Sequence, residues 1–223
     1  MQIKIVFENE HFLAVDKPSG LLSVPSSFSQ DDPRPVLGRI LEEQTNWKLF
    51  PIHRLDMEAS GIMLWARSLQ AQTVASRWFE ERSVSKNYQA LTEGKADELS
   101  PGKKFCWESK ILKGKKRAFE DPNGKMAVTY ATFLAIRIFQ GQQVLLWDLQ
   151  PMTGRFHQLR FELVRHGFPI LGDERYGATL PFEPNAIALR ASELDLSRCE
   201  KASKWGLPSK LKVESFTLFR AHS

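Results

Sequence analysis

The chain has 223 residues, of which 42% are hydrophobic, and a formal net charge of +5. This length suffices for one large domain or two small ones, and the lack of a long apolar run excludes a membrane-spanning helix. A positive charge of this size favours a polyanionic partner without requiring one. The two cysteines, Cys106 and Cys199, lie far apart and outside any CxxC pattern, which predicts free, buried thiols and a cytoplasmic location. The alternating first residues do not resemble a signal or transit peptide.

The first fifty residues predict two short strands and a helix. Polar and apolar residues alternate over residues 3–7, which favours a strand, and the apolar run that ends at Asp16 favours a second strand over residues 12–16. Lys17-Pro18-Ser19-Gly20 then breaks the second strand, and residues 26–35, rich in Ser, Asp and Pro, predict a loop. Apolar residues at helical spacing predict an amphipathic helix over residues 36–44.

One carboxylate, Asp56, lies between an apolar approach and a turn at Ala59-Ser60-Gly61. The apolar residues 62–66 that follow read as a buried strand. A carboxylate packed inside a protein needs a positive or hydrogen-bonding partner, or it loses its charge. The sequence therefore raises the question of which residue is the partner of Asp56.

The rest of the chain predicts one helix capped by Ser68, over residues 69–81, and mostly antiparallel strands. Strands are expected over residues 83–91, 125–139, 144–149, 187–191 and 211–219. Tyr88 lies in the first of these strands, where a half-buried aromatic ring is the usual role. Residues 192–206 are polar and predict a peripheral segment.

A basic segment comes before the long strand at residue 125. It contains Lys110, Lys113, Lys115, Lys116 and Arg117. Runs of charge are usually solvated hairpin loops, whereas a flexible basic loop beside a cleft is a natural phosphate contact. The sequence leaves both interpretations open.

A second chemically rich stretch runs from Thr153 to Arg160. Thr153 is a plausible N-cap, and apolar residues at helical spacing follow it. Arg160 falls at the edge of this apolar stripe, where its guanidinium either requires an acid or reaches solvent. Asp56 is the acid that needs a partner, so we expect Asp56 and Arg160 to pair.

These stretches together resemble the RluA family of RNA pseudouridine synthases. The matching motifs, in chain order, are Lys17-Pro18-x-Gly20, His53-Arg54-Leu55-Asp56-x-x-x-Ser60-Gly61, Lys86-x-Tyr88 followed by Gly94, Gly124-Lys125-x-Ala127-x-Thr129, Thr153-Gly154-Arg155-Phe156-His157-Gln158-Leu159-Arg160 and Gly167-x-Pro169-Ile170-x-Gly172-Asp173-x-x-Tyr176-Gly177. Ala59 departs from the family pattern, which usually has Thr there, and removes one hydroxyl from the turn.

The resemblance implies an α+β fold with a large mixed, mainly antiparallel sheet, flanked by helices and loops around a basic catalytic cleft. We expect a single catalytic domain over residues 1–223, with no added N-terminal RNA-binding module, acting as a monomer. The coarse pattern of hairpins with few helices fits this fold class.

The resemblance also implies the activity: isomerisation of uridine to pseudouridine in structured ribosomal or transfer RNA, without cofactor or metal. Asp56 would be the catalytic carboxylate, Arg160 its ion-pair partner and Tyr88 a ring packed on the target base. Arg54 would fill the space left by the flipped base, although an ion pair with Glu58 would equally explain it. Further RNA contacts are expected from His53, Lys86, Lys113, Lys115, Lys116, Arg155 and His157.

Two other functions compete with this interpretation. A metal-dependent hydrolase would use His53, Asp56, His157 and Asp173 as ligands, but no HExxH motif or cysteine cluster supports it. Outside this alternative, the sequence indicates that Asp173 and Tyr176 shape a turn. A non-catalytic RNA-binding protein would keep the cleft without the reaction, and the intact set of Asp56, Tyr88 and Arg160 argues against it.

Overall fold

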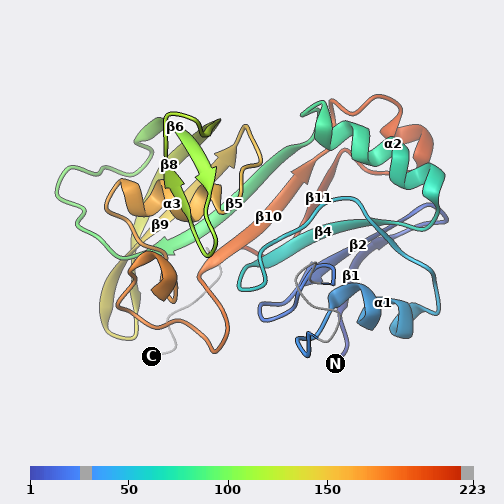
Figure 1. Ribbon diagram of the computed structural model, residues 1–223, viewed down its shortest axis with the longest axis horizontal. Helices are drawn as coiled ribbons and strands as arrows, with labels where there is room; N and C mark the ends of the chain where they lie inside the picture. The colour runs from blue at the N-terminus through green and yellow to red at the C-terminus, as the bar shows by residue number, and fades with distance from the viewer. Residues whose placement is uncertain (26–31, 217–223) are drawn as a thin grey trace. The chain divides into compact units, whose positions relative to one another are not determined.

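The computed structural model describes residues 1–25 and 32–216, and its contacts divide the chain into two compact units (Figure 1). Unit 1 comprises Met1–Ser85 and Ala191–Val213, and unit 2 comprises Lys86–Arg190 and a short piece that starts at Glu214. The single catalytic domain expected for residues 1–223 stays a prediction. Most of the loop expected at residues 26–35 lies outside the described residues.

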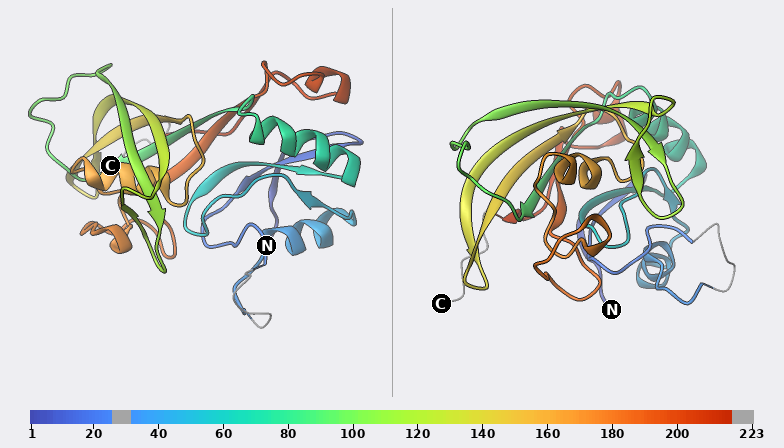
Figure 2. Two further views of the ribbon diagram at one scale, coloured as in Figure 1. Left: turned by 45° about the horizontal axis from the view of Figure 1, so that its top comes forward. Right: turned by 60° about the vertical axis from the view of Figure 1, so that its left-hand side comes forward.

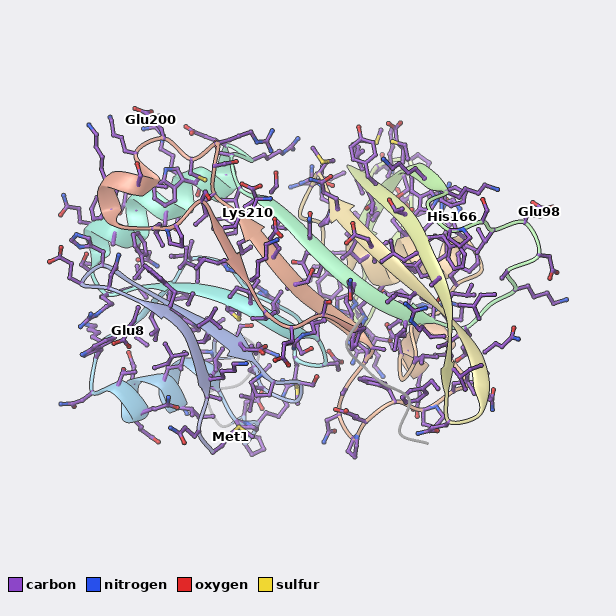
Figure 3. All side chains as sticks on the ribbon, turned by 180° about the vertical axis from the view of Figure 1, so that it is seen from behind. Met1, Glu8, Glu98, His166, Glu200 and Lys210 are labelled. Atoms are coloured by element: carbon purple, nitrogen blue, oxygen red, sulfur yellow. The ribbon has the colours of Figure 1, made fainter. Side chains whose placement is uncertain are left out.

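Unit 1 is built on strands in the order β1-β2-β4-β10, with β3 paired to β4 and β11 paired to β10. The pairs β1–β2, β2–β4, β3–β4 and β10–β11 are antiparallel. These strands are β1 (Lys4–Glu8), β2 (Phe12–Lys17), β3 (Phe50–Pro51), β4 (Ser60–Ala66), β10 (Leu189–Asp195) and β11 (Lys210–Lys212). Strand β2 and strand β4 are almost entirely buried and form the core of the unit. Lys210, labelled in Figure 3, joins β11 to β10 because its Nζ lies 3.1 Å from carboxylate oxygens of both Glu193 and Asp195.

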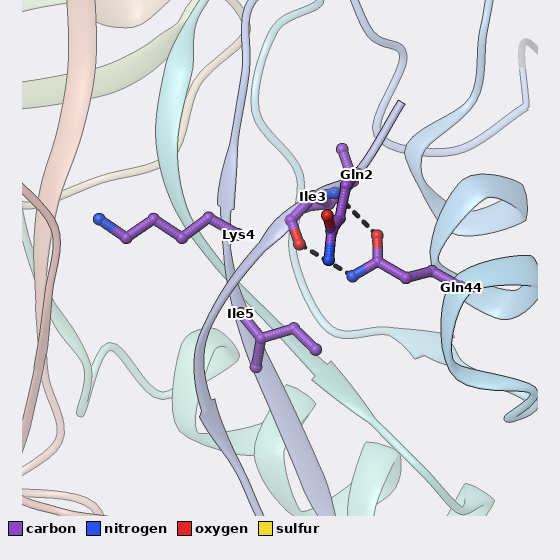
Figure 4. Close-up of a pocket in the computed structure, with 5 residues that line it drawn as sticks. All are labelled: Gln2, Ile3, Lys4, Ile5 and Gln44. Atoms are coloured by element: carbon purple, nitrogen blue, oxygen red, sulfur yellow. Dashed lines mark hydrogen bonds between the residues drawn. The ribbon is translucent and has the colours of Figure 1, made fainter.

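Two α-helices belong to unit 1: α1 (Leu37–Thr45) and α2 (Leu69–Glu80). The predicted cap of α2 is confirmed, since Ser68 Oγ accepts a hydrogen bond from the Ala71 amide at 3.2 Å. Helix α1 is joined to the start of the chain by Gln44, whose side-chain amide bonds both the N–H and the C=O of Ile3 (Figure 4). A 3-10 helix, η2 (Ala202–Trp205), lies in the segment expected to be peripheral.

Unit 2 is a strongly curved antiparallel sheet in the order β5-β9-β8-β6-β7. Its strands are β5 (Ser85–Thr92), β6 (Lys104–Lys113), β7 (Ala118–Glu120), β8 (Lys125–Phe139) and β9 (Gln142–Pro151). Helix α3 (Gln158–Arg165) lies on the concave face, as the right-hand view of Figure 2 shows, and the short helix η1 (Glu174–Tyr176) follows it. We call the face covered by α3 the inner face and the opposite one the outer face.

Three sequence expectations need correction. The strand expected at 187–191 is observed as Leu189–Asp195, and the closing strand expected at 211–219 is only Lys210–Lys212, with residues 217–219 outside the described part. Both cysteines are free thiols as predicted, yet Cys106 is exposed because it points from the outer face of β6, and only Cys199 is buried. Among the described residues, no helix is both long and apolar enough to cross a membrane.

Candidate functional site

In unit 1 the residues around Asp56 form a loop that leads into β4. Leu55, just before Asp56, is buried, and its backbone is held by one side chain: Ser23 Oγ donates to the Leu55 carbonyl at 2.8 Å and accepts from the Leu55 amide at 3.1 Å. Asp56 itself is only partly buried. The loop backbone is therefore fixed from within, while the carboxylate of Asp56 keeps access to its surroundings.

Lys17, at the end of β2, is completely buried beneath this loop. Its Nζ donates hydrogen bonds to the backbone carbonyls of Pro18 at 3.0 Å, Met57 at 3.1 Å and Ala59 at 2.7 Å. An ammonium group has three N–H donors, and here each donor has one carbonyl acceptor. Two of the three acceptors, Met57 and Ala59, follow Asp56, so Lys17 fixes the course of the chain on the C-terminal side of that residue.

Burial lowers the pKa of Lys17 from 10.5 to about 8, while the negative charges of Asp56 and Glu58 act in the opposite direction. A buried amine whose pKa is shifted this far is typical of functional sites, although structural networks produce such shifts too. The protonated Lys17 therefore attracts the Asp56 carboxylate.

Gly61 explains why glycine ends the turn after Asp56. Its φ of +117° lies in a region that other residues rarely adopt, and a Cβ at this position would collide with the backbone of Ala191. Ala59, where the resembling family usually has Thr, is buried. The turn therefore closes here with an apolar methyl group in place of a hydroxyl.

His53, an expected RNA contact, is bound to the body of unit 1. Its Nε2 accepts a hydrogen bond from the Leu64 amide at 3.0 Å, and its ring stacks on Phe79 with centroids 4.6 Å apart. An imidazole nitrogen that accepts an N–H carries no proton, so this bond selects the tautomer with hydrogen on Nδ1. These contacts fit a structural role, and an additional contact of His53 with RNA stays a prediction.

Arg54 is exposed in the same loop. The ion pair with Glu58 that the sequence suggested is not observed: within the described residues, no carboxylate oxygen lies within 4.0 Å of the Arg54 guanidinium. An ion pair with Glu58 therefore does not fix the orientation of the Arg54 side chain.

In unit 2 the partner of Arg160 is Asp173. The Arg160 Nε donates to Asp173 Oδ2 and its Nη2 to Asp173 Oδ1, both at 2.7 Å, and the side chains are 2% and 1% exposed. Sequence reasoning placed Arg160 at the edge of the apolar stripe with Asp56 as its acid. Instead the guanidinium is fully buried, and Asp173 does more than shape a turn. A contact between Arg160 and Asp56, which belong to different units, stays a prediction.

His157 and Tyr176 extend this network. The His157 Nδ1 lies 3.1 Å from Tyr176 Oη, and His157 Nε2 lies 3.5 Å from Arg160 Nη1. Because a guanidinium can only donate, a bond to Nε2 requires that the proton of His157 is on Nδ1. Tyr176 Oη also accepts the Ala118 amide at 2.7 Å. Both residues are buried, so contact of His157 with RNA, as the resemblance implies, stays a prediction.

Thr153 is not the N-cap that the sequence suggested. Helix α3 begins at Gln158 after His157, which has a left-handed backbone and no capping side chain. Thr153 Oγ1 instead accepts the Val128 amide at 3.0 Å and donates to Gln158 Oε1 at 2.7 Å. The first bond ties the threonine to strand β8 and the second to the side chain of the first helical residue, so Thr153 Oγ1 caps no backbone amide of α3.

Gln158 holds the start of α3 on the sheet through all of its amide groups. Its Nε2 donates to the Val128 carbonyl at 3.0 Å and to Thr129 Oγ1 at 2.9 Å. Its Oε1 accepts the Arg155 amide at 3.0 Å in addition to Thr153. The turn that carries Arg155 and His157 is therefore rigidly placed within unit 2.

The remaining candidate residues of unit 2 lie on its strands and turns. Tyr88 is half-buried on β5, opposite Leu149 of β9, and faces the inner side of the sheet with it. Arg155 donates from Nε to the Met126 carbonyl at 2.9 Å, and Lys113 lies 5.1 Å from the centre of the Phe156 ring. Lys86 begins unit 2 as a half-buried residue of β5.

The basic segment is a β-hairpin. Its strands are the end of β6 and β7, and the Gly114 amide donates to the Arg117 carbonyl at 3.0 Å across the turn. Lys115 and Lys116, which lie in the turn, are exposed. The hairpin expected from the sequence is observed, and contact with phosphate stays a prediction.

The ligand set of the competing metal hydrolase is divided between the units: His53 and Asp56 belong to unit 1, His157 and Asp173 to unit 2. Asp173 is engaged with Arg160. Across residues 1–25 and 32–216, no three His, Cys, Asp or Glu side chains are grouped closely enough to hold a metal ion.

Two residues that sequence reasoning did not place in the site are Lys17 and Ser23, and it took Asp173 for a turn residue. A lysine at the end of a buried apolar strand was a signal for Lys17, because such a charge must be satisfied by nearby acceptors. No local pattern distinguishes Ser23 from other loop serines. For Asp173, the signal was Arg160, whose guanidinium requires an acid if it is buried and which precedes Asp173 in the neighbouring motif.

Comparison with known proteins supports the resemblance. A family model described as RNA pseudouridylate synthase matches residues 11–164. The dual-specificity RNA pseudouridine synthase RluA of Pasteurella multocida is 38% identical over 178 residues, which cover 78% of this chain and 77% of the relative. The tRNA pseudouridine synthase C of Vibrio parahaemolyticus is 29% identical over 213 residues, covering 87% and 84%. The ribosomal large subunit pseudouridine synthase C of Rickettsia typhi is 31% identical over 215 residues, covering 93% and 67%.

Solved structures confirm the fold. The human RNA pseudouridylate synthase domain containing 1 aligns with a TM-score of 0.78 at 24% identity, covering 97% of this chain and 85% of that one. The human RNA pseudouridylate synthase domain containing 4 aligns with a TM-score of 0.69 at 22% identity, covering 95% and 88%. The expected α+β class, a large and mostly antiparallel sheet with few helices, is thus confirmed; the described residues contain three α-helices.

Proposed function

This chain belongs to the RluA-like RNA pseudouridylate synthase family and is an isomerase, and from that premise we propose that Asp56 is its catalytic carboxylate, acting on uridines of structured ribosomal or transfer RNA. The observation that carries the assignment is the Lys17 clamp. Its buried ammonium holds two backbone carbonyls just after Asp56, those of Met57 and Ala59, and attracts the Asp56 carboxylate electrostatically, an arrangement that orients this residue.

For this reaction the protein must mainly position the uridine and supply a charged group. The bond between N1 of uracil and C1′ of ribose breaks, the ring turns, and C5 bonds to C1′ before the C5 proton is lost. An ionised carboxylate serves this sequence as a nucleophile at the sugar or the base, or as a base at C2′. Asp56 fits these roles because Ser23 and Lys17 hold the backbone of its loop in place.

Arg160 and Tyr88 complete the proposed site. Asp173 occupies Nε and Nη2 of Arg160, and this leaves the guanidinium with a fixed plane from which further N–H groups extend. In the proposal, these groups bind the Asp56 carboxylate and keep it ionised. Tyr88 is proposed to pack on the target base and to assist proton transfer at C5.

A uridine inside a stem-loop must leave the stack before it can react, at a cost of a few kcal/mol. Arg54 is proposed to fill the space that the base leaves, because a planar guanidinium can stack as a base does. Its exposure fits this role. Lys86, Lys113, Lys115, Lys116, Arg155, His53 and His157 are proposed as the surrounding RNA contacts.

The substrate class is proposed from the relatives. Their names specify transfer RNA for one, the large ribosomal subunit for another and dual specificity for a third. We propose that this chain likewise acts on one or both of these RNAs, as a cytoplasmic monomer that needs no cofactor.

The test replaces Asp56 by Asn, which preserves the shape of the side chain and removes its charge. Asp56→Asn is expected to abolish pseudouridine formation in total RNA while the affinity for the same RNA changes by no more than a few-fold. Mapping of pseudouridines in RNA from cells with and without the protein identifies the substrate for this measurement. Appreciable turnover by the Asn variant would refute the catalytic assignment.

A further inference from the structure

The outer face of the unit 2 sheet carries a continuous row of exposed apolar side chains. Residues alternate along β6 and β8, so that buried side chains point to α3 and exposed ones point away. The exposed large apolar residues of this face are Leu112, Phe119, Met126, Tyr130 and Met152. Phe119 is 42%, Met126 46% and Tyr130 47% exposed, which is unusual for side chains of this size in strands.

Strand register shows that these side chains are neighbours. Phe119 of β7 lies directly opposite Leu112 of β6, and Lys110, two residues before Leu112, lies opposite Met126 of β8. Tyr130 lies opposite Cys106, and the Met152 amide bonds the Val128 carbonyl between Met126 and Tyr130. Side chains opposite each other on one face of a sheet are about 5 Å apart, so Phe119 is a neighbour of Leu112. Along β8 the half-buried Val128 lies on the same face between Met126 and Tyr130 and makes the row continuous.

The same part of the chain holds the positive charge of the protein. Residues 103–125 contain eight Lys and Arg residues against three Asp and Glu residues, a net charge of +5, which equals that of the whole chain. Lys104, Lys110 and the acidic Glu108 stand in the outer face itself. The exposed hairpin turn that joins β6 to β7 adds Lys115, Lys116 and Arg117, so cations remain in excess. An apolar face of this kind, surrounded by excess cations, is complementary to a polyanion that also presents flat apolar rings.

We propose that the outer face of β6, β7 and β8 is a second RNA-binding surface, which takes a single-stranded segment by stacking bases on Phe119 and Tyr130 while the lysines bind its phosphates. Grooves that bind single strands combine these two elements. The surface is distinct from the proposed catalytic residues of unit 2, because Tyr88 and Arg160 lie on the inner face. The inference extends the proposed function, since it assumes that RNA is the substrate. A protein partner suits the face less well, because such a partner would have to neutralise the lysines with acidic residues of its own.

The binding test uses the full chain and an oligoadenylate, which contains no uridine and therefore cannot be isomerised. Phe119→Ala and Tyr130→Ala are each expected to weaken its affinity by about 5- to 100-fold, the range for loss of one stacked base. Tyr130→Phe, which keeps the ring, should bind as the unaltered protein does. Ile138→Ala is the matched control, because Ile138 is 55% exposed on the same strand but lies beyond the part of β8 that pairs with β6, opposite Gln143 of β9. An abasic oligonucleotide of the same length should bind the unaltered protein more weakly than oligoadenylate.

Cys106 provides a second measurement without any mutation, because it is exposed opposite Tyr130. Oligoadenylate is expected to slow alkylation of Cys106. Full reactivity of Cys106 at saturating oligonucleotide, or unchanged affinity in both Ala variants, would overturn the proposal. If those variants instead abolished self-association or the binding of a protein, the outer face would be a protein-docking surface and our assignment would be wrong. Because these measurements involve no catalysis, they are independent of the outcome of Asp56→Asn.

Discussion

Arg160 and Asp173 form a two-pronged ion pair in the interior of unit 2, with both N···O distances at 2.7 Å and neither side chain more than 2% exposed. The pair fixes the plane of the guanidinium before any substrate arrives. Asp173 follows α3 and leads into η1, so it connects the turn after the helix to a residue within the helix. An arginine that must meet a reacting carboxylate benefits from such a fixed orientation, because little entropy is then lost on forming the contact.

Asp173→Asn is expected to destabilise the protein by about 3–5 kcal/mol, the range for leaving one member of a buried ion pair without its partner. The free energy of unfolding in urea measures this. The control is Glu81→Gln, which removes a solvent-exposed partner of Arg77 and should leave stability nearly unchanged. A loss in Asp173→Asn no larger than that of the control would show that the pair contributes little to the fold.

The titration of Lys17 predicts a pH dependence of stability. Its folded pKa of about 8 lies below the ordinary value of 10.5, so between these values the unfolded chain binds more protons than the folded one. Stability from this group therefore rises with pH across the window from about 8 to 10.5, by about 3 kcal/mol in all. Lys17→Met lacks this ionisation. The difference in unfolding free energy, unaltered protein minus Lys17→Met, should increase over that window, and a flat difference would mean that Lys17 titrates normally.

Deprotonation of Lys17 should also affect the reaction in the opposite direction. A neutral amine has two N–H groups for the three carbonyls of Pro18, Met57 and Ala59, so one of the three bonds is lost. Two of these bonds hold the Asp56 loop, which is therefore held less firmly. The rate of isomerisation is expected to fall as pH rises through about 8. Lys17→Arg, which stays charged, would show no such fall if it folds; an unchanged pH profile in the unaltered protein would argue against the clamp.

Arg54→Ala is expected to reduce activity on a structured stem-loop by more than on a short, flexible strand with the same target uridine. The reason is that only a stacked base leaves a space for the guanidinium to fill. Single-turnover rates on the two substrates measure the effect. Because Arg54 is exposed, the fold should be unaffected, which thermal unfolding can verify. Equal losses on both substrates would remove the flipping role.

The two thiols should differ in reactivity. Burial raises the pKa of Cys199 to about 11, so at pH 8 this thiol is almost entirely protonated and shielded. Cys106 is exposed on β6. Iodoacetamide followed by peptide mass spectrometry should therefore modify Cys106 in the folded protein and Cys199 only after unfolding. Rapid modification of Cys199 in the native protein would indicate that η2 and the segment before it open readily.

The sequence by itself determined the local features of this protein. The Ser68 cap and the long hairpin of β8 and β9 follow from patterns of a few residues, because cap geometry and the two-residue period of a strand are local properties. The ordered motifs likewise sufficed for the family. They also pointed to Asp56 as the residue of greatest chemical interest.

Only the tertiary structure decided which groups satisfy the buried charges. For Arg160 the sequence suggested only Asp56, a contact that stays a prediction, and the structure shows that Asp173 binds the same guanidinium. Lys17 was expected only at the end of a strand, and its ammonium binds the Ala59 carbonyl of the Asp56 loop. The structure likewise moved Thr153 from a helix cap to a strand contact. The physical reason is that a buried charge must find its partner among whatever groups packing brings near it, and packing joins residues whose separation along the chain carries no local signal.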